Sequence, residues 1–347
     1  MLSRRRSRSG SRDVSGAGYR LTQELPRLRD IEEAESRIRR YIPPTPLERS
    51  GGISASCGRE IYLKLEVFQP IRVFKIRGAL NKLLCLGDSA LKKGVVTASS
   101  GNHGLAIAYA SKMFGVKAVV CVPERVNPQK LAAIQEEGAE LVRFGSGYDE
   151  AYENAVKVAA QRGMTFVHAF NDADVIAGQG TCGLEIAHQN SEIDSAVVAI
   201  GGGGLISGVS IALKETLDGV RVYGAETTAI PSMYESVEQG RLVEVTPKPT
   251  IADGMQAKVP GELTFEAVRK NIDRIGLVND SQLEDAIFEL LSKARVLAEP
   301  AGASPLAALK GPLADENGKI TVLVISGGNI ALSLLAEILR KRLPGSL

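Results

Sequence analysis

The chain has 347 residues, of which 44% are hydrophobic and 24% are charged, and its formal net charge is +2. This length allows two lobes with separate cores, and the near-neutral charge argues against nucleic acid or an anionic membrane as partner. No apolar run is long enough to span a bilayer, since even residues 196–200 are followed by glycines. We therefore expect a protein that acts on small molecules.

The cysteines and the first residues indicate the compartment. Cys57, Cys85, Cys121 and Cys182 stand far apart without a C-x-x-C pair, which argues against a zinc site and a disulfide framework. A reducing cytoplasm fits this usage. Residues 1–27 begin with arginines mixed with serine and glycine, so we expect a disordered basic tail, with a targeting presequence as the alternative.

Apolar residues at helical spacing predict a first helix over 28–41, which a proline-rich segment ends. Beyond it, short apolar runs alternate with amphipathic stretches, a pattern typical of βαβ units and a mainly parallel sheet. Ligands of such sheets bind beyond the carboxyl ends of the strands. The predicted strands are 60–65, 94–97, 118–122, 140–144, 165–167, 195–200, 221–225 and 320–325, and the predicted helices are 78–86, 103–114, 127–137, 148–162, 181–189, 205–217, 280–297 and 303–309.

Lys75 is a single ammonium among apolar neighbours, in Val-Phe-Lys-Ile-Arg-Gly over 73–78. Such a lysine would be partly desolvated, which lowers its pKa and frees an amine that can form a Schiff base with an aldehyde. The alternative is a lysine whose charged end reaches the surface.

The first Gly-rich turn, residues 98–104, follows a predicted strand and opens a predicted helix. In it, Asn102 offers both a donor and an acceptor, and Ser100 offers a hydroxyl that can give or take a proton. An ordinary helix cap is the alternative.

The second turn, Gly201-Gly202-Gly203-Gly204, lies between a predicted strand and a predicted helix. Its backbone N–H groups can converge at the helix N-terminus and bind phosphate. Because Val209 follows Gly208 and no register gives G-x-G-x-x-G, a compact monophosphate is favoured over a nucleotide. The alternative is a flexible turn without a ligand.

The third turn places Ser326 after the strand 320–325, where its neutral hydroxyl would lie at the end of the sheet. A simple strand-to-helix turn is the alternative. Taken together, the lysine, the phosphate turn, the Asn-Ser turn and this hydroxyl match the aldehyde, phosphate, ring hydroxyl and ring nitrogen of pyridoxal 5′-phosphate (PLP).

The sequence also resembles the fold-type II pyridoxal-phosphate enzymes, in particular the threonine dehydratase and serine racemase branch. The resemblance covers about residues 31–338. It is carried by segments at 44–47, 74–79, 99–104, 177–181, 201–204, 251–254, 299–303 and 326–329.

The resemblance implies an α/β fold like the tryptophan synthase β subunit, with two open, mainly parallel twisted sheets flanked by helices. A large PLP-binding domain would cover 28–93 and 172–347, and a small domain 94–171. A homodimer or homotetramer is expected.

The resemblance also assigns roles to residues. Lys75 would hold PLP covalently, Phe74 would pack near it, Asn102 would bind the ring hydroxyl, and Ser326 would bind the pyridine nitrogen. The phosphate would be bound by Gly201, Gly202, Gly203 and Gly204, and the substrate carboxylate by Ser99, Ser100, Gly101, Asn102 and His103. Asp253, Glu299 and Arg72 are further candidates.

The implied reaction is the dehydration and deamination of L-threonine to 2-oxobutanoate, or of L-serine to pyruvate, with release of ammonia. Lys75 would take the α-proton. If Ser100 lies on the opposite face of the substrate, it could return a proton there, and the enzyme would be a serine racemase. Two non-enzymatic alternatives are a phosphate-ligand binding protein and a protein whose basic tail binds nucleic acid.

Two departures from the family bear on these expectations. The family has Thr-Gly-Ser before Phe-Lys, whereas this chain has Ile71, Arg72 and Val73. Arg72 would point to solvent or help to bind an acidic substrate, so that another 3-hydroxy amino acid such as 3-hydroxyaspartate remains open. The metal group of serine racemases pairs a Glu with an Asp six residues on, and here Glu226 is followed by Ser232, so no metal is expected.

Overall fold

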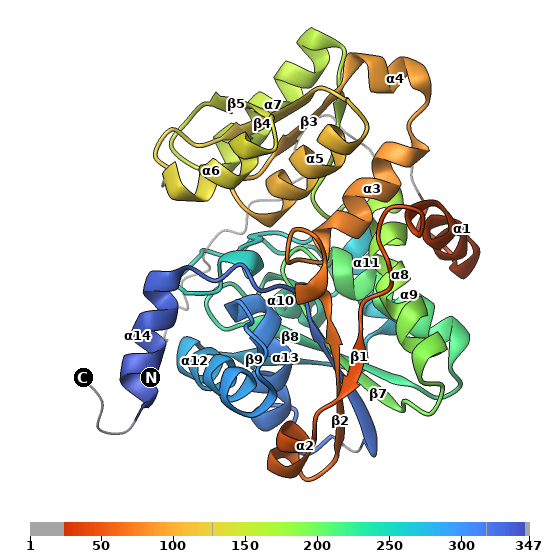
Figure 1. Ribbon diagram of the computed structural model, residues 1–347, viewed down its shortest axis with the longest axis vertical. Helices are drawn as coiled ribbons and strands as arrows, with labels where there is room; N and C mark the ends of the chain where they lie inside the picture. The colour runs from red at the N-terminus through yellow and green to blue at the C-terminus, as the bar shows by residue number, and fades with distance from the viewer. Residues whose placement is uncertain (1–23, 127, 317, 344–347) are drawn as a thin grey trace, which may run out of the picture.

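The computed structural model describes residues 24–126, 128–316 and 318–343. Most of the predicted basic tail lies outside the described residues. The chain forms an α/β structure with two separate sheets flanked by helices, as the family resemblance implies. In Figure 1 the four-stranded sheet occupies the upper part of the molecule and the six-stranded sheet the lower part.

The six-stranded sheet has the order β1-β2-β10-β7-β8-β9. All its neighbouring strands pair in parallel except β1 and β2. The sequence does not predict β1 or β9, because both are short or only partly buried. Its strands are β1 (Leu47–Arg49), β2 (Glu60–Leu65), β7 (Ser195–Ala199), β8 (Arg221–Thr227), β9 (Arg274–Val278) and β10 (Ile320–Ile325).

The four-stranded sheet has the order β5-β4-β3-β6, and all its pairs are parallel. Each of these strands is predicted from the sequence to within one residue at either end. The strands are β3 (Val95–Ala98), β4 (Ala118–Val122), β5 (Glu140–Arg143) and β6 (Thr165–Phe166).

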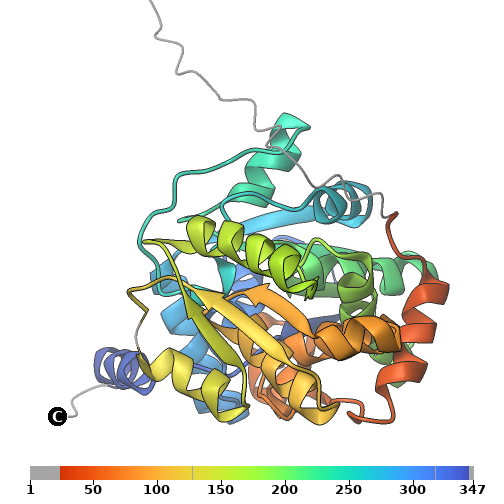
Figure 2. The same cartoon turned by 90° about the horizontal axis from the view of Figure 1, so that it is seen from above.

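Helices cover both faces of each sheet, and Figure 2 shows α14 at the periphery of the molecule. In the described part of the chain the α-helices are α1 (Leu28–Ile38), α2 (Gly51–Cys57), α3 (Lys75–Cys85), α4 (Asp88–Lys93), α5 (Asn102–Met113), α6 (Pro128–Glu136), α7 (Tyr148–Arg162), α8 (Ala173–Gln189), α9 (Gly204–Thr216), α10 (Ser232–Gln239), α11 (Glu262–Asn271), α12 (Asp280–Glu289), α13 (Pro300–Lys310) and α14 (Leu332–Arg342).

The core explains the apolar character of the central strands. Along β7, Val197 packs in the cluster that contains α12 and α13, whereas Ala196 and Val198 pack in the cluster that contains α8 and α9. A strand buried on both faces reads as a continuous apolar run, which is why these strands can be recognised in the sequence.

Helix α8 begins at Ala173, well before the predicted start at Thr181. The Asp172 carboxylate caps it by accepting the N–H groups of Asp174 and Val175 at 2.9 and 3.2 Å. Gly178 and Gly180 suggest, from the sequence, that a helix is interrupted there. In the structure they lie inside α8, where it contacts other helices. A Cβ on Gly178 would lie 2.7 Å from the Arg77 carbonyl oxygen of α3, and one on Gly180 would lie 3.0 Å from the Gly208 carbonyl oxygen of α9.

The single helix predicted over 280–297 is wrong in its second half. Helix α12 ends at Glu289 and continues as a π-helical turn, Leu290–Ala294. Arg295 then adopts a left-handed conformation with φ of 58°, which ends the helical segment. Nothing in the apolar spacing of this segment distinguishes the π-helical turn from a continued α-helix.

A buried cluster of charges joins β2, α3 and α8. The Arg77 guanidinium is fully buried and binds both oxygens of Glu66, at 2.7 and 2.8 Å, and both oxygens of Glu185, each at 2.8 Å. Lys64, also fully buried, donates to Glu185 at 2.7 Å. Burial raises the pKa of Glu66, but the neighbouring Arg77 lowers it further, to about 2. Two cations therefore balance two carboxylates inside the protein.

We predict that Arg77→Ala lowers the free energy of unfolding by about 3–5 kcal/mol, because it leaves two buried carboxylates without their guanidinium. Urea unfolding followed by circular dichroism measures this loss. The control is Arg274→Ala, which removes a pair with Glu316 in which the arginine side chain is 51% exposed. Its cost should be much smaller, because solvent screens an exposed ion pair. Equal costs for both variants would contradict a structural role for the buried cluster.

Candidate active site

The predicted site residues of both sheets meet at the carboxyl ends of β10 and β7 and at the N-termini of α3, α5 and α9. Lys75 is the first residue of α3. The segment before it is held against the turn after β10, since Phe74 N donates to Ser326 O at 3.0 Å and Val73 forms a β-bridge with Gly327. Two segments that are far apart in the sequence therefore lie side by side.

The Lys75 amine is half-buried and faces few groups that favour its charge. Its Nζ donates to the Ala169 carbonyl oxygen at 3.0 Å and lies 5.0 Å from the centre of the Phe74 ring. Burial lowers the pKa of Lys75 to about 8, although the Glu299 carboxylate acts in the opposite direction. A substantial fraction of this amine is neutral, and nucleophilic, slightly above neutral pH.

The Gly201–Gly204 turn lies directly after β7 and opens α9. Gly203 adopts a left-handed conformation with φ of 92°. A Cβ on Gly201 would lie 2.8 Å from the Gly254 carbonyl oxygen, and one on Gly202 would lie 2.2 Å from the Phe170 ring. Glycine is thus required by backbone conformation and by close contact, and the turn presents its N–H groups at a helix N-terminus, which suits a phosphate.

The Ser99–His103 turn also ends in a helix N-terminus, because α5 begins at Asn102. The Gly101 N–H donates to Ser99 Oγ at 3.2 Å, and Ser100 is half-buried. The first-turn N–H groups of a helix have no intrahelical acceptor, so they are suited to bind a carboxylate. Gly104 is required by packing, since its Cβ would lie 2.4 Å from Ser99 O.

Asn102 makes contacts that the sequence does not predict. Its Nδ2 donates to the two Glu299 oxygens at 2.9 and 3.0 Å, and its Oδ1 accepts from Asn329 at 2.9 Å. Glu299 is buried, which raises its pKa, while the hydrogen bonds from Asn102 lower it. The carboxylate therefore determines which end of the Asn102 amide faces it. Glu299, Asn329 and Asn102 belong to three separate segments that resemble the family.

Two histidines lie near Lys75, and only His103 is among the predicted site residues. Burial and the nearby Lys75 charge lower the pKa of His103 to about 3 and that of His168 to about 4. His168 Nδ1 accepts the N–H groups of Phe170 and Asn171 at 3.2 and 2.8 Å. No motif in the sequence indicates His168, because its partners are backbone groups.

The remaining candidates lie at the margin of this cluster. Ser326 is buried at the end of β10. Arg72 is exposed and has a left-handed conformation with φ of 60°; its guanidinium lies 3.4 Å from the Val67 carbonyl oxygen. Asp253 is exposed on the 3-10 turn Asp253–Met255 and accepts from Gln256 at 3.3 Å.

Glu226, which the family resemblance relates to a metal ligand of serine racemases, binds backbone groups. Its carboxylate oxygens accept Met233 N at 2.9 Å and Tyr234 N at 2.8 Å, at the start of α10. Burial raises the pKa of Glu226 to about 8. Within the described ranges, no three side chains of His, Cys, Asp or Glu are grouped to hold a metal ion.

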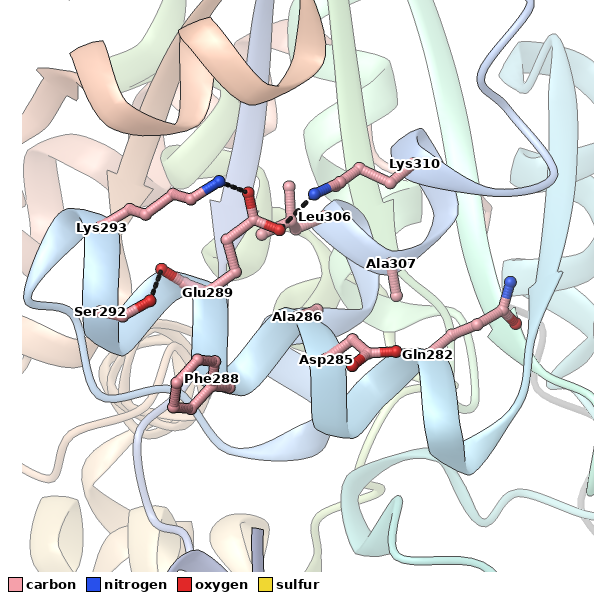
Figure 3. Close-up of a pocket in the computed structure, with 10 residues that line it drawn as sticks. All are labelled: Gln282, Asp285, Ala286, Phe288, Glu289, Ser292, Lys293, Leu306, Ala307 and Lys310. Atoms are coloured by element: carbon pink, nitrogen blue, oxygen red, sulfur yellow. Dashed lines mark hydrogen bonds and ion pairs between the residues drawn. The ribbon is translucent and has the colours of Figure 1, made fainter. Parts of the chain in front are cut away.

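A separate pocket of about 450 Å³ lies between α12 and α13 (Figure 3). Glu289 accepts there from Lys293 at 2.8 Å and also from Lys310, so both ammonium groups are already paired. None of the predicted site residues lines this pocket. In the part of the chain that the structure describes, no helix has the length and apolarity needed to cross a bilayer.

Comparison with known proteins identifies relatives over most of the chain. The family described as pyridoxal-phosphate dependent enzyme matches residues 38–334. An L-threonine ammonia-lyase of Thermotoga maritima is 44% identical over 316 residues, which are 91% of this chain and 79% of that protein. A catabolic L-threonine dehydratase, TdcB, of Staphylococcus aureus is 37% identical over 322 residues, covering 92% and 93%.

Solved structures agree with this grouping. Maize serine racemase has a TM-score of 0.86 and 34% identity, covering 91% of this chain and 97% of that one. The processed form of threonine deaminase isoform 2 from Solanum lycopersicum has a TM-score of 0.85 and 31% identity, covering 91% of this chain and 92% of that one.

We predict that His103 and His168 each lower the stability of the cofactor-free protein as the pH falls from about 6.5 to about 4, a loss that Glu226, with its pKa raised to about 8, partly offsets. Folded His168 and His103 stay neutral in this window, whereas in the unfolded chain they protonate near their ordinary pKa of 6.5. The unfolded state therefore binds more protons, and each histidine contributes about 1.4 kcal/mol per pH unit. Urea unfolding at several pH values measures the slope. It should be shallower in His168→Asn, and an unchanged slope in that variant would contradict the assignment.

We predict that Gly202→Ala weakens PLP binding and destabilises the fold by about 1–3 kcal/mol, because its methyl group would overlap the Phe170 ring. Spectrophotometric titration with PLP and thermal unfolding measure these effects. Gly51→Ala is the control, since a Cβ there meets nothing within 4 Å. Adding Phe170→Ala to Gly202→Ala should restore part of the lost stability, and a single variant as stable as the wild type would refute the overlap.

Proposed function

The chain belongs to the family of pyridoxal-phosphate dependent enzymes, and on this premise we propose that it is an L-threonine ammonia-lyase that also accepts L-serine. The products are 2-oxobutanoate, or pyruvate from serine, together with ammonia. The observation that carries this proposal is the half-buried Lys75 amine, with a pKa lowered to about 8, beside a glycine turn suited to phosphate. The relatives at 37–44% identity are threonine ammonia-lyases and dehydratases.

The residues around Lys75 fit PLP. The Gly201–Gly204 turn has no room for a Cβ at Gly202, and its first glycines approach other segments closely, so N–H groups rather than side chains line it. We infer that this turn binds the phosphate, that Asn102 binds the ring hydroxyl and that Ser326 binds the pyridine nitrogen, with Phe74 packing nearby. Ser326 is neutral and cannot charge that nitrogen as a carboxylate would, which favours loss of the β-hydroxyl over transamination.

When bound, PLP supplies an aldehyde for covalent attachment and an electron-withdrawing ring that acidifies the α-proton of an amino acid. The protein supplies binding and proton transfer. Lys75 would hold the cofactor, and its neutral Nζ would accept the α-proton of the substrate. The N–H groups and hydroxyls of residues 99–103 bind the substrate carboxylate, which fixes the α-carbon next to Lys75.

Two other substrates or outcomes have specific support. Maize serine racemase shares the fold at 34% identity, and racemisation would need a proton donor such as Ser100 opposite Lys75. Arg72 replaces a small residue of the family and is exposed near the site, which would suit an acidic substrate such as 3-hydroxyaspartate. The family consists of enzymes, which argues against a non-catalytic phosphate-ligand binding protein.

We further infer the domain boundaries, the compartment and the oligomeric state of this enzyme. The two sheets correspond to a large domain over 28–93 and 172–347 and a small domain over 94–171, with the site between them. The enzyme is proposed to be a cytoplasmic homo-oligomer, in line with the four free cysteines and the near-neutral charge. Asp253 and Glu299 are proposed as further site residues.

We predict that the PLP-loaded wild type releases ammonia and 2-oxobutanoate from L-threonine, and that Lys75→Ala lowers turnover by roughly 10²–10⁴-fold or more, because the α-proton loses its acceptor. Lys293→Ala removes a remote lysine and should leave turnover unchanged. Keto-acid and ammonia assays with L-threonine, L-serine and 3-hydroxyaspartate, and a D-serine assay, distinguish the alternatives. Full turnover in Lys75→Ala would exclude the proposed mechanism, and D-serine as main product would favour the racemase.

A further inference from the structure

The segment from Val167 to Asp172 connects the last strand of the four-stranded sheet to α8, and it passes directly beside Lys75. Its two ends are anchored. Val167 N donates to Val96 O at 2.8 Å and Val167 O accepts from Thr97 Oγ1 at 2.8 Å. At the other end, Asp172 caps α8 and binds Lys82 at 2.7 Å. Between these anchors the backbone belongs to no strand or helix.

His168 holds the middle of this segment. Its Nδ1 accepts two consecutive backbone N–H groups, from Phe170 at 3.2 Å and Asn171 at 2.8 Å. An imidazole nitrogen that accepts two hydrogen bonds carries no proton, so the proton of the neutral ring is on Nε2. The ring also packs edge-on against Phe170, with centroids 4.5 Å apart, and against Tyr152 at 5.8 Å. The imidazole therefore acts as an acceptor that closes a turn over residues 168–171.

This turn makes contacts with both functional parts of the site. Ala169 O accepts from Lys75 Nζ at 3.0 Å. A Cβ on Gly202 would lie 2.2 Å from the Phe170 ring, and one on Gly204 would lie 3.0 Å from Phe170 Cβ. Asn171 Oδ1 accepts from Leu263 N at 3.0 Å, next to Thr264, which binds Gly202 O at 2.7 Å. A change in the conformation of this turn would thus move two groups together: Ala169 O, which accepts from Lys75 Nζ, and the Phe170 ring, which lies against Gly202.

We propose that His168 is a positioning residue: through Nδ1 it holds the 168–171 turn in the conformation that sets Ala169 O against Lys75 Nζ and the Phe170 ring against Gly202. This inference rests on the proposed function, because it gives both contacts a role in binding PLP. His168 itself is not a base, since its unprotonated nitrogen is occupied by two N–H groups.

Two substitutions of His168 distinguish the role of its hydrogen-bond acceptor, Nδ1, from the role of its aromatic ring. In His168→Asn, Oδ1 is bonded to Cγ as Nδ1 is in histidine, so it can accept the same two N–H groups, as asparagine does in turns. In His168→Phe, the edge-on ring contacts remain and the acceptor is lost. The experiment uses the full-length protein and two readouts: hydrogen exchange of the 168–172 amides without cofactor, and the PLP dissociation constant by spectrophotometric titration.

We expect two effects of roughly tenfold or more in His168→Phe, because two hydrogen bonds are lost: faster exchange of the Phe170 and Asn171 amides, and a higher PLP dissociation constant. His168→Asn should stay within about twofold of the wild type in both readouts. If His168→Phe fails to fold, His168→Ala takes its place. Wild-type behaviour of the Phe variant, or equal loss in the Asn variant, would overturn the proposal.

The two proposals fail in different ways. A wild type that binds PLP but releases no ammonia from threonine would refute the ammonia-lyase function, and the exchange and affinity comparison would still decide the role of His168. Conversely, the wild type could be fully active while His168→Phe matches it in amide exchange over 168–172 and in its PLP dissociation constant. That result would refute only the positioning role.

Discussion

The buried pairing of Arg77 with Glu66 and Glu185 is the constraint on which the site depends. Arg77 lies two residues after Lys75 in α3, and its guanidinium is bound to carboxylates from the turn after β2 and from α8. Because neither carboxylate can be left unpaired in the interior, the first turn of α3 has one acceptable position. That position leaves Lys75 at the helix start, half-buried and near Ala169.

The site combines elements that belong to different sheets. The six-stranded sheet provides the Gly201–Gly204 turn and Ser326, while the four-stranded sheet provides the Ser99–His103 turn at the end of β3 and the segment that follows β6. Lys75, on a helix that packs against α5 as well as α8, lies between them. The chemistry of the amine thus depends on both sheets. Ala169 O, which accepts from Lys75 Nζ, follows the four-stranded sheet, and the Gly201–Gly204 turn follows a strand of the six-stranded sheet.

Features with a local cause could be predicted from the sequence, and features with a distant cause could not. The strands 60–65, 118–122 and 320–325 are correctly bounded, and 118–122 and 320–325 are nearly continuous apolar runs because both of their faces are buried. The predicted site residues do converge, because strand ends and helix starts share one edge of each sheet. His168 and the Asn102–Glu299 pair depend on partners far away in the chain or on backbone groups, which leave no local pattern.

The glycines of α8 have a mechanical consequence. A Cβ on Gly178 would lie 2.7 Å from Gly78 Cα in α3, and one on Gly208 of α9 would lie 2.4 Å from Gly180 N in α8. These three helices are therefore in direct backbone contact, and little relative sliding is possible without a clash. Lys75 is the first residue of α3 and Gly204 is the first residue of α9. The distance between the Lys75 amine and the glycine turn is therefore nearly fixed. Any opening of the site must take place in the segments outside this three-helix body.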